Sequence, residues 1–153
     1  MSHEIPSEVL AHWCLEAASV RHIPIGNINP TFVVDDSGKK MVLQRLHPIF
    51  DASVHEDIEA ITAHLENHGL TTPRLVRARD GRLCAQTAGG LWRALTYVPG
   101  HCHEHVPSVR LARSGGDLVG RFHAALLDLS HNYHFTRAGV HDTQAHLWKL
   151  RQA

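Results

Sequence analysis

Hydrophobic and polar residues alternate in three short stretches of the first third of the chain, which indicates β-strands. We expect strands at about Val20–Ile25, Pro30–Asp35 and Lys40–Leu46. The segment PIGN (24–27) interrupts the first stretch, and the segment DDSG (35–38) turns the chain between the second and the third. The pattern therefore predicts consecutive strands joined by a loop of small residues and by a tight turn.

Apolar residues spaced three or four positions apart predict a helix on either side of these strands. The first helix is expected from Ser7, a candidate N-cap, to about Ala18. For the second, Ser53 and Glu56 are interpreted as a capping box, and Gly69 as the residue after its C-cap. The apolar stripe of the second helix consists of Val54, Ile58, Ile61 and Leu65.

The second half of the chain contains three further strand candidates, followed by helical patterns. Strands are expected at about 74–78, 83–87 and 91–98, and the short connections between them favour antiparallel pairing. Beyond Pro99-Gly100 a helix is predicted over about Ser108–Leu129, with a break possible at Gly115-Gly116 because each glycine weakens a helix by about 1 kcal/mol. A last helix begins at Asp142, its predicted N-cap.

The predicted fold class follows from this order of elements. It is α+β, with a roughly five-stranded antiparallel sheet and a packed helix in residues 1–98. Residues 99–153 are expected to form a hinge and the first helices of a second, incomplete lobe.

The amino-acid composition narrows the partner molecules and the cellular compartment that we expect for this chain. The 153-residue chain carries fifteen Lys and Arg residues against fifteen Asp and Glu residues, without a basic stripe, so a nucleic-acid partner is not expected. No apolar run reaches the ~18 residues of a membrane span, and the first residues lack the pattern of a signal peptide. Three unpatterned cysteines favour a reduced, cytoplasmic protein.

Fifteen histidines make metal binding an alternative function. The densest group is the HCHEH segment (101–105), whose nitrogen and sulfur donors suit Zn²⁺. His64 and His68 are one helical turn apart, but without a third ligand they are interpreted as exposed helix residues.

The loop between the first two strands is suited to binding phosphate groups. A loop of small residues between paired strands leaves backbone N–H groups free to bind phosphate oxygens, and the next strand brings a polar or basic side chain beneath them. Together with the later segments GNINPTFVV, MVLQRLHPIF, IEAITAHL, LTYVPG and VHDT, the loop resembles the N-terminal lobe of the aminoglycoside phosphotransferase/choline kinase superfamily, which has a protein-kinase-like fold. Within this superfamily, the sequences of these segments most resemble those of the N-acetylhexosamine 1-kinases.

The resemblance implies ATP and Mg²⁺ as cofactors and assigns a set of nucleotide-contacting residues. These are Gly26, Asn27, Asn29, Thr31, Gln44, Arg45, Glu59, Thr96 and Val98. Gln44 aligns with the family's strand lysine but carries no charge, whereas Arg45 is charged but is expected on the opposite face of the strand, so which of the two meets the phosphates stays open. Glu59 would be the helix glutamate, paired with Gln44 or Arg45, and the segment from Thr96 to Val98 would be the hinge that binds adenine.

The implied activity is phosphorylation of a small hydroxylated acceptor, a sugar first and an aminoglycoside or amino alcohol second. The family's catalytic loop has an asparagine five positions after an aspartate, and none of the eight aspartates fits. The Mg²⁺ ligands are therefore not expected in this chain, which we expect to transfer no phosphate alone. It is either a truncated kinase or a non-catalytic nucleotide- or metal-binding module.

Residues of the incomplete lobe carry a further expectation. Without covering structure, apolar side chains of the last helices should be exposed and could mediate self-association. They are Phe122, Leu126, Trp148 and Leu150.

Overall fold

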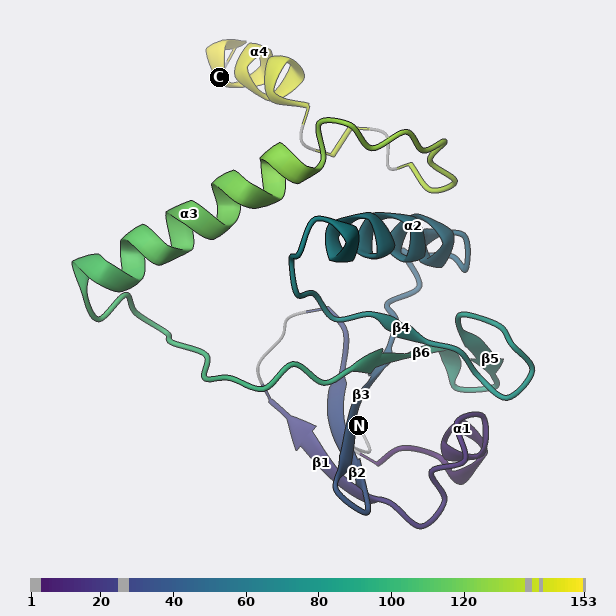
Figure 1. Cartoon of the computed structure of the whole chain (residues 1–153). Coiled ribbons are helices and arrows are strands. Elements are labelled where there is room, and N and C mark those ends of the chain that lie inside the picture. The colour runs from purple at the N-terminus through teal and green to yellow at the C-terminus, as the bar shows by residue number, and fades with distance from the viewer. Residues whose placement is uncertain (1–3, 25–27, 137–138, 141, 153) are drawn as a thin grey trace.

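The structure is a computed structural model that describes residues 4–24, 28–136, 139–140 and 142–152. A twisted antiparallel sheet lies between a short helix on one side and a longer helix on the other, and two further helices extend away from it (Figure 1). The strands are β1 (Ser19–Ile23), β2 (Thr31–Asp36), β3 (Lys39–Arg45), β4 (Leu75–Val76), β5 (Ala85–Thr87) and β6 (Gly90–Thr96). The helices are α1 (Ser7–Ala11), α2 (Val54–Asn67), α3 (Val109–Ala125) and α4 (Thr143–Gln152).

The sheet order is β1-β2-β3-β6-β4, with β5 paired to β6, and every pair is antiparallel. The α+β class and the antiparallel sheet are confirmed, with six strands in place of about five. The predicted turn between β2 and β3 is a two-residue hairpin in which Ser37 and Gly38 both have positive φ, of 53° and 88°. Because both central residues adopt this conformation, the turn matches the twist of the flanking strands and fixes their register.

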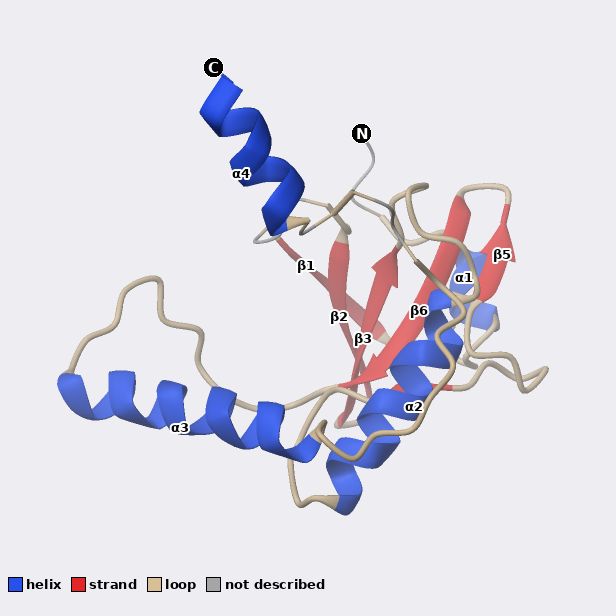
Figure 2. Ribbon diagram, turned by 90° about the horizontal axis from the view of Figure 1, so that it is seen from above, coloured by secondary structure: helices blue, strands red, loops and turns tan. Residues whose placement is uncertain are grey.

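One face of the sheet forms the main hydrophobic core. Phe32, Leu43 and Trp92 lie on adjacent strands and pack with Val9 of α1 and with Trp13. Leu43 and Val9 are fully buried. Since side chains alternate along each strand, the neighbouring Gln44 and Arg93 lie on the opposite face, the one toward α2 (Figure 2).

The first helix is shorter than predicted. Its hydrogen bonding ends near His12, and Cys14 has a positive φ of 58°, so the chain turns there instead of continuing to Ala18. The turn places Trp13 and Leu15 in the core, where they are 7% and 2% exposed. The free energy gained by burying these two side chains thus outweighs that of a longer helix.

The C-terminal end of α2 was predicted correctly, whereas the capping of its N-terminal end was not. The capping box is wrong: the Ser53 side chain makes no cap, and its hydroxyl donates to Asp51 Oδ1. At the other end Gly69, with φ of 69°, donates its N–H to the Glu66 carbonyl. The N–H of Leu70 donates to the Leu65 carbonyl at 2.9 Å, which completes a Schellman motif and confirms Gly69 as the helix terminator.

The two last helices have side-chain N-caps, of which Asp142 was predicted, and exposed apolar faces. Ser108 accepts a hydrogen bond from the Leu111 N–H, and α3 then continues through Gly115 and Gly116 without a break. Asp142 accepts from the Ala145 N–H at 2.9 Å, as expected of an N-cap.

The expected exposure of apolar side chains at these helices is largely confirmed. Phe122, Trp148 and Leu150 are 38%, 63% and 72% exposed, whereas Leu126 is half-buried against the cluster of Leu65 and Leu70. Among the described helices, none is both long and apolar enough to cross a membrane.

Candidate functional site

The glycine-bearing loop between β1 and β2 is the first element of the candidate site. Gly26 and Asn27 lie outside the described residues. After them, Asn29 Oδ1 accepts the His47 N–H at 2.9 Å, and Thr31 Oγ1 donates to the Asn29 carbonyl at 2.9 Å. The first bond attaches the end of the loop to the segment that follows β3, and the second joins the loop to the first residue of β2.

A chain of hydrogen bonds runs from this loop across three strands. Gln44 Nε2 on β3 donates to Thr31 Oγ1 at 3.0 Å, and Arg93 on β6 donates to Gln44 Oε1 through Nε at 3.0 Å and Nη2 at 2.8 Å. Gln44 is thereby fixed in orientation, with its amide nitrogen toward the loop strand and its oxygen on the guanidinium. Arg45 pairs with Trp92 on the other face of the sheet, as strand alternation predicted.

Arg93 supplies the positive charge that Gln44 lacks. Burial lowers the pKa of its guanidinium from the usual value. Among the described residues, no carboxylate lies within ion-pair distance of this guanidinium. A desolvated cation without a counter-charge favours an anionic ligand.

Arg93 was not among the residues predicted for the site, although the sequence carries a signal for it. The segment LWRALTYV (91–98) is apolar except for this arginine and one threonine. A charged residue in the middle of such a strand is rarely buried without a partner. The identity of that partner depends on the register of β3 against β6, which pairs Gln44 with Arg93 across 49 positions of sequence.

His55 lies on the first turn of α2, near enough to Arg93 for the guanidinium charge to act on its ring. It is fully buried, its Nδ1 lies 2.9 Å from the Ala52 carbonyl, and its Nε2 has no hydrogen-bond partner within the part of the chain that the structure describes. Burial lowers the pKa of His55, and the charge of Arg93 lowers it further. The ring is therefore neutral at pH 7, with Nδ1 donating and Nε2 offering a lone pair.

Glu59 has a different partner from the one expected. Its Oε1 accepts from Arg77 Nη2 at 3.2 Å, so the prediction of a pair with Gln44 or Arg45 is wrong. Arg77 directly follows β4, at the end of the sheet order beyond β6, which brings its long side chain to α2. The second oxygen of Glu59 is buried without a hydrogen-bond partner among the described residues.

The predicted hinge follows β6 directly. The N–H of Thr96 donates to the Arg74 carbonyl at 2.8 Å and its hydroxyl accepts from the Arg74 N–H, so the main-chain donor of Thr96 is occupied. No hydrogen bond within the described part of the chain engages Val98, which is 42% exposed. The main-chain groups of Val98 are thus available to a ligand, whereas the N–H of Thr96 is not.

The cluster around Arg93 fits phosphate oxygens better than a magnesium ion. Its hydrogen-bonding groups come from Thr31, Gln44 and Arg93 and include no carboxylate. Mg²⁺ prefers carboxylate oxygens and water. The described residues of this cluster therefore do not provide a magnesium site.

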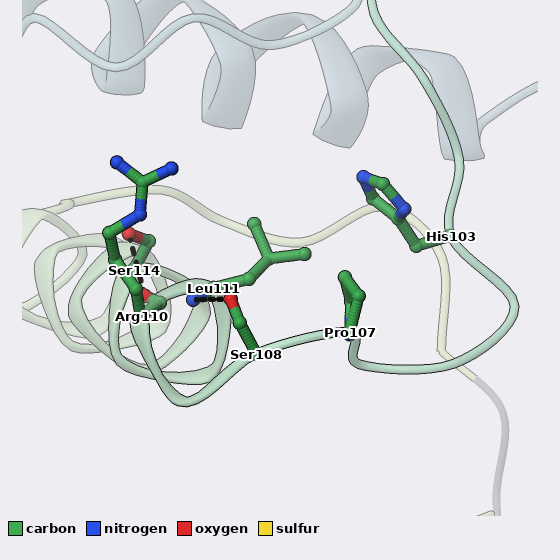
Figure 3. Close-up of a pocket in the computed structure, with 6 residues that line it drawn as sticks. All are labelled: His103, Pro107, Ser108, Arg110, Leu111 and Ser114. Atoms are coloured by element: carbon green, nitrogen blue, oxygen red, sulfur yellow. Dashed lines mark hydrogen bonds between the residues drawn. The ribbon is translucent and has the colours of Figure 1, made fainter.

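The histidine-rich segment 101–105 does not form a metal centre in this structure. Its residues are all exposed, and none belongs to a group of three potential ligands among the described residues. His103 lines a hollow at the start of α3, next to Pro107, Ser108 and Leu111, in which no second histidine takes part (Figure 3). The geometry therefore gives the metal-binding alternative no support at this segment.

Comparisons with known proteins identify the family. A family model for the phosphotransferase enzyme family matches residues 19–153. The chain belongs to this phosphotransferase family. The superfamily inferred from sequence is thereby confirmed, while the N-acetylhexosamine 1-kinase branch stays a prediction. No curated protein matches the chain.

Solved structures support the fold. A microcompartment-associated aminopropanol kinase matches 86% of the chain with a TM-score of 0.66 and 19% identity. Amicoumacin kinase hAmiN, solved with AMP-PNP, Ca²⁺ and Ami, matches 94% with a TM-score of 0.67 and 18% identity. An aminoglycoside phosphotransferase from Alicyclobacillus acidocaldarius subsp. acidocaldarius DSM 446 matches 99% with a TM-score of 0.65 and 19% identity. The chain spans 42%, 45% and 43% of these three proteins, less than half of each.

Proposed function

We propose that this chain is the nucleotide-binding portion of an ATP-dependent phosphotransferase, and that Arg93 contacts the ATP phosphates in the role of the family's strand lysine. The observation that carries the proposal is the half-buried guanidinium of Arg93, held by Gln44 and without a carboxylate partner among the described residues. A phosphate group would supply the missing negative charge and accept charge-assisted hydrogen bonds from the remaining N–H groups.

The rest of the nucleotide extends from this cation in both directions. The family resemblance assigns Gly26, Asn27 and Asn29 to the phosphates, and Thr31 links Asn29 to Gln44. The adenine lies against the segment after β6, where the free main-chain groups of Val98 bind its edge. In this arrangement residues 1–98 hold the nucleotide, and residues 99–153 form the hinge and the start of a helical part.

The acceptor is a small hydroxylated molecule. Sugars were the first expectation from sequence, whereas the similar solved structures are named for aminopropanol, amicoumacin and aminoglycoside substrates. Acceptor screens should therefore include amino alcohols and aminoglycosides beside hexosamines. We propose that the chain alone does not transfer phosphate, because it lacks the Asp-x₄-Asn pattern of the catalytic loop.

The decisive test is calorimetric titration of the purified chain with ATP, with and without Mg²⁺. Arg93→Gln removes a charge-assisted contact and should weaken ATP binding about 10- to 100-fold, which corresponds to about 1.5–3 kcal/mol. Arg45→Gln is the matched control, since Arg45 lies on the other face of the sheet, and should leave the affinity unchanged.

A charge-swap variant separates a local role of the cation from a general loss of folding. In the double variant Gln44→Lys/Arg93→Gln, the positive charge returns to β3 beside its former position, because the two residues are register partners. ATP affinity should recover to within a few-fold of the wild type. An Arg93→Gln variant that is folded by circular dichroism and binds ATP normally would contradict the role of Arg93, and wild-type protein without any ATP binding would contradict the function.

A further inference from the structure

Two histidines at the C-terminal end of α2 and an aspartate after α3 converge at the surface of the molecule. His64 lies in the last turn of α2, His68 is its C-cap residue, and Asp128 follows the C-terminal end of α3. His64 Nε2 lies 3.0 Å and His68 Nε2 3.5 Å from the same oxygen of Asp128. The fold thus brings a third potential ligand to a histidine pair that the sequence alone left incomplete.

The distances match those of a metal centre. A tetrahedral Zn²⁺ ion binds histidine nitrogen at about 2.0–2.1 Å and carboxylate oxygen at about 2.0–2.2 Å, which separates neighbouring ligand atoms by about 3.3 Å. The two measured separations, 3.0 and 3.5 Å, bracket this value. All three ligand atoms lie within 4.8 Å of one another.

We propose that His64, His68 and Asp128 form a binding site for a divalent transition-metal ion of the Zn²⁺ class, between α2 and the segment after α3. Two imidazoles and one carboxylate suit such an ion, and three protein ligands leave at least one coordination position for water. The site is open to solvent, since the three side chains are 20%, 38% and 69% exposed. An ion can therefore enter without unfolding the protein.

The metal would replace hydrogen bonds that now hold the same groups. His64 Nε2 lies 2.7 Å from the Ala125 carbonyl as well as 3.0 Å from Asp128. To ligate the metal through Nε2, the neutral His64 ring carries its proton on Nδ1 instead, which frees the Ala125 carbonyl for water. Ligation by His64, by the C-cap residue His68 and by Asp128 would join α2 to the segment after α3 more firmly than the present hydrogen bonds.

A second group of candidate ligands is less suited to a metal. Asp57, His131 and His134 also lie close together, but both oxygens of Asp57 already accept hydrogen bonds, from the His131 ring and from the main-chain N–H groups of His134 and Phe135. An ion at that position would have to displace them. Hydrogen bonding within the protein accounts for that cluster, so the exposed site is the one we propose.

The test is titration of the chain, produced without a polyhistidine tag, with Zn²⁺ by calorimetry and with Co²⁺ by visible absorption. Wild-type protein should bind one ion tightly and show the intense absorption of tetrahedral Co²⁺. His68→Ala and Asp128→Asn should each weaken binding about tenfold or more, since even the loss of a hydrogen bond to a ligand typically costs that much. His103→Ala, in the exposed segment 101–105, is the matched control.

Outcomes of the test are distinguishable from those of the nucleotide experiment, because no residue of the metal site takes part in the Arg93 cluster. Loss of metal binding in His68→Ala and Asp128→Asn, with the control normal, would support the site. Unchanged binding in these two variants, or a loss that follows His103→Ala, would overturn it. Thermal denaturation provides an independent readout: saturating Zn²⁺ should raise the Tm of the wild type and not that of His68→Ala.

Discussion

Asp57 is expected to be the most important buried charge for the stability of this chain. It lies on α2, its side chain is 8% exposed, and its oxygens accept hydrogen bonds from His131 Nε2 at 2.8 Å, the His134 N–H at 2.9 Å and the Phe135 N–H at 3.0 Å. These bonds attach the segment after α3 to α2. We predict that Asp57→Asn lowers the free energy of unfolding substantially without changing the fold.

The magnitude follows from the number of bonds affected. Each hydrogen bond to a charged group contributes about 1.5–3 kcal/mol, and an asparagine can keep one oxygen acceptor but turns its amide group toward the remaining donors. One to two of the three bonds are therefore lost, and the expected cost is about 1.5–6 kcal/mol.

The effect should also depend on pH in a predictable direction. Burial alone would raise the pKa of Asp57, but the hydrogen bonds from His134, His131 and Phe135 outweigh it and lower the pKa below its usual value. Because the folded-state pKa lies below that of the unfolded chain, the stabilisation is complete above the unfolded pKa of about 3.9 and is lost as the pH falls through the folded-state value. The difference in stability between wild type and Asp57→Asn should thus be constant near pH 7 and shrink below about pH 4.

Urea denaturation followed by circular dichroism at several pH values provides the measurement. Asp117→Asn is the control, since Asp117 lies on exposed α3 and makes no hydrogen bond or ion pair within the described residues. A cost below about 0.5 kcal/mol for Asp57→Asn, the range of ordinary surface substitutions, would refute the reasoning. So would an equal effect of the two substitutions at pH 7.

Further substitutions test the fold and its exposed surface. Gly115→Ala should stabilise α3 by about 1 kcal/mol, because its Cβ would meet no atom within 4 Å. Gly38→Ala should destabilise the β2–β3 hairpin by about 1–2 kcal/mol because of its φ of 88°, and thermal melts of both variants measure the two effects. Leu43→Ala, at a fully buried position, should cost about 2–5 kcal/mol in urea denaturation, and a smaller loss would argue against the main core. The exposed Trp148 and Leu150 should cause concentration-dependent self-association in light scattering, reduced by serine at both positions, and a monomer at all concentrations would contradict this.

Much of the sheet could be predicted because its signals are local. Alternation of apolar residues placed β2 and β3, and the DDSG turn fixed the connection between them. The same alternation correctly put Gln44 and Arg45 on opposite faces. Gly69 ended α2 as expected, since a residue with positive φ is needed there whatever the surroundings.

The predictions failed where a distant or a competing hydrogen-bond partner determines the position of a side chain. The Ser53 hydroxyl was expected to cap α2, but Asp51 lies two residues away and accepts its hydrogen bond instead. Glu59 pairs with Arg77 because β4 lies beyond β6 in the sheet order, which sequence periodicity does not reveal. Arg93 was missed for the same reason, because its partner Gln44 is set by strand register.

The helix α2 connects the Arg93 cluster with the contacts made by the segment after α3, and its geometry makes the energetics of the two separable. At 100° per residue, His55 and Glu59 lie on one side of the helix, toward the sheet and Arg93, whereas Asp57 and His64 lie about opposite to them. The second side contacts the end of α3 and the segment after it, through His64 with the Ala125 carbonyl and through Asp57 with His134.

Arg93 of β6 lies toward one side of α2, and Asp57 lies on the other side of that helix. The two residues share no hydrogen-bond partner, so their substitutions should act independently. In urea denaturation, the costs of Asp57→Asn and Arg93→Gln should add to within about 0.5 kcal/mol. Those of Asp57→Asn and His64→Ala should not add, because once one contact is lost the segment beyond α3 is free to detach and the other contact has less to hold. Additivity of this second pair would mean that the segment is held by its two contacts separately, and strong coupling of the first pair would mean that α2 transmits changes from one side to the other.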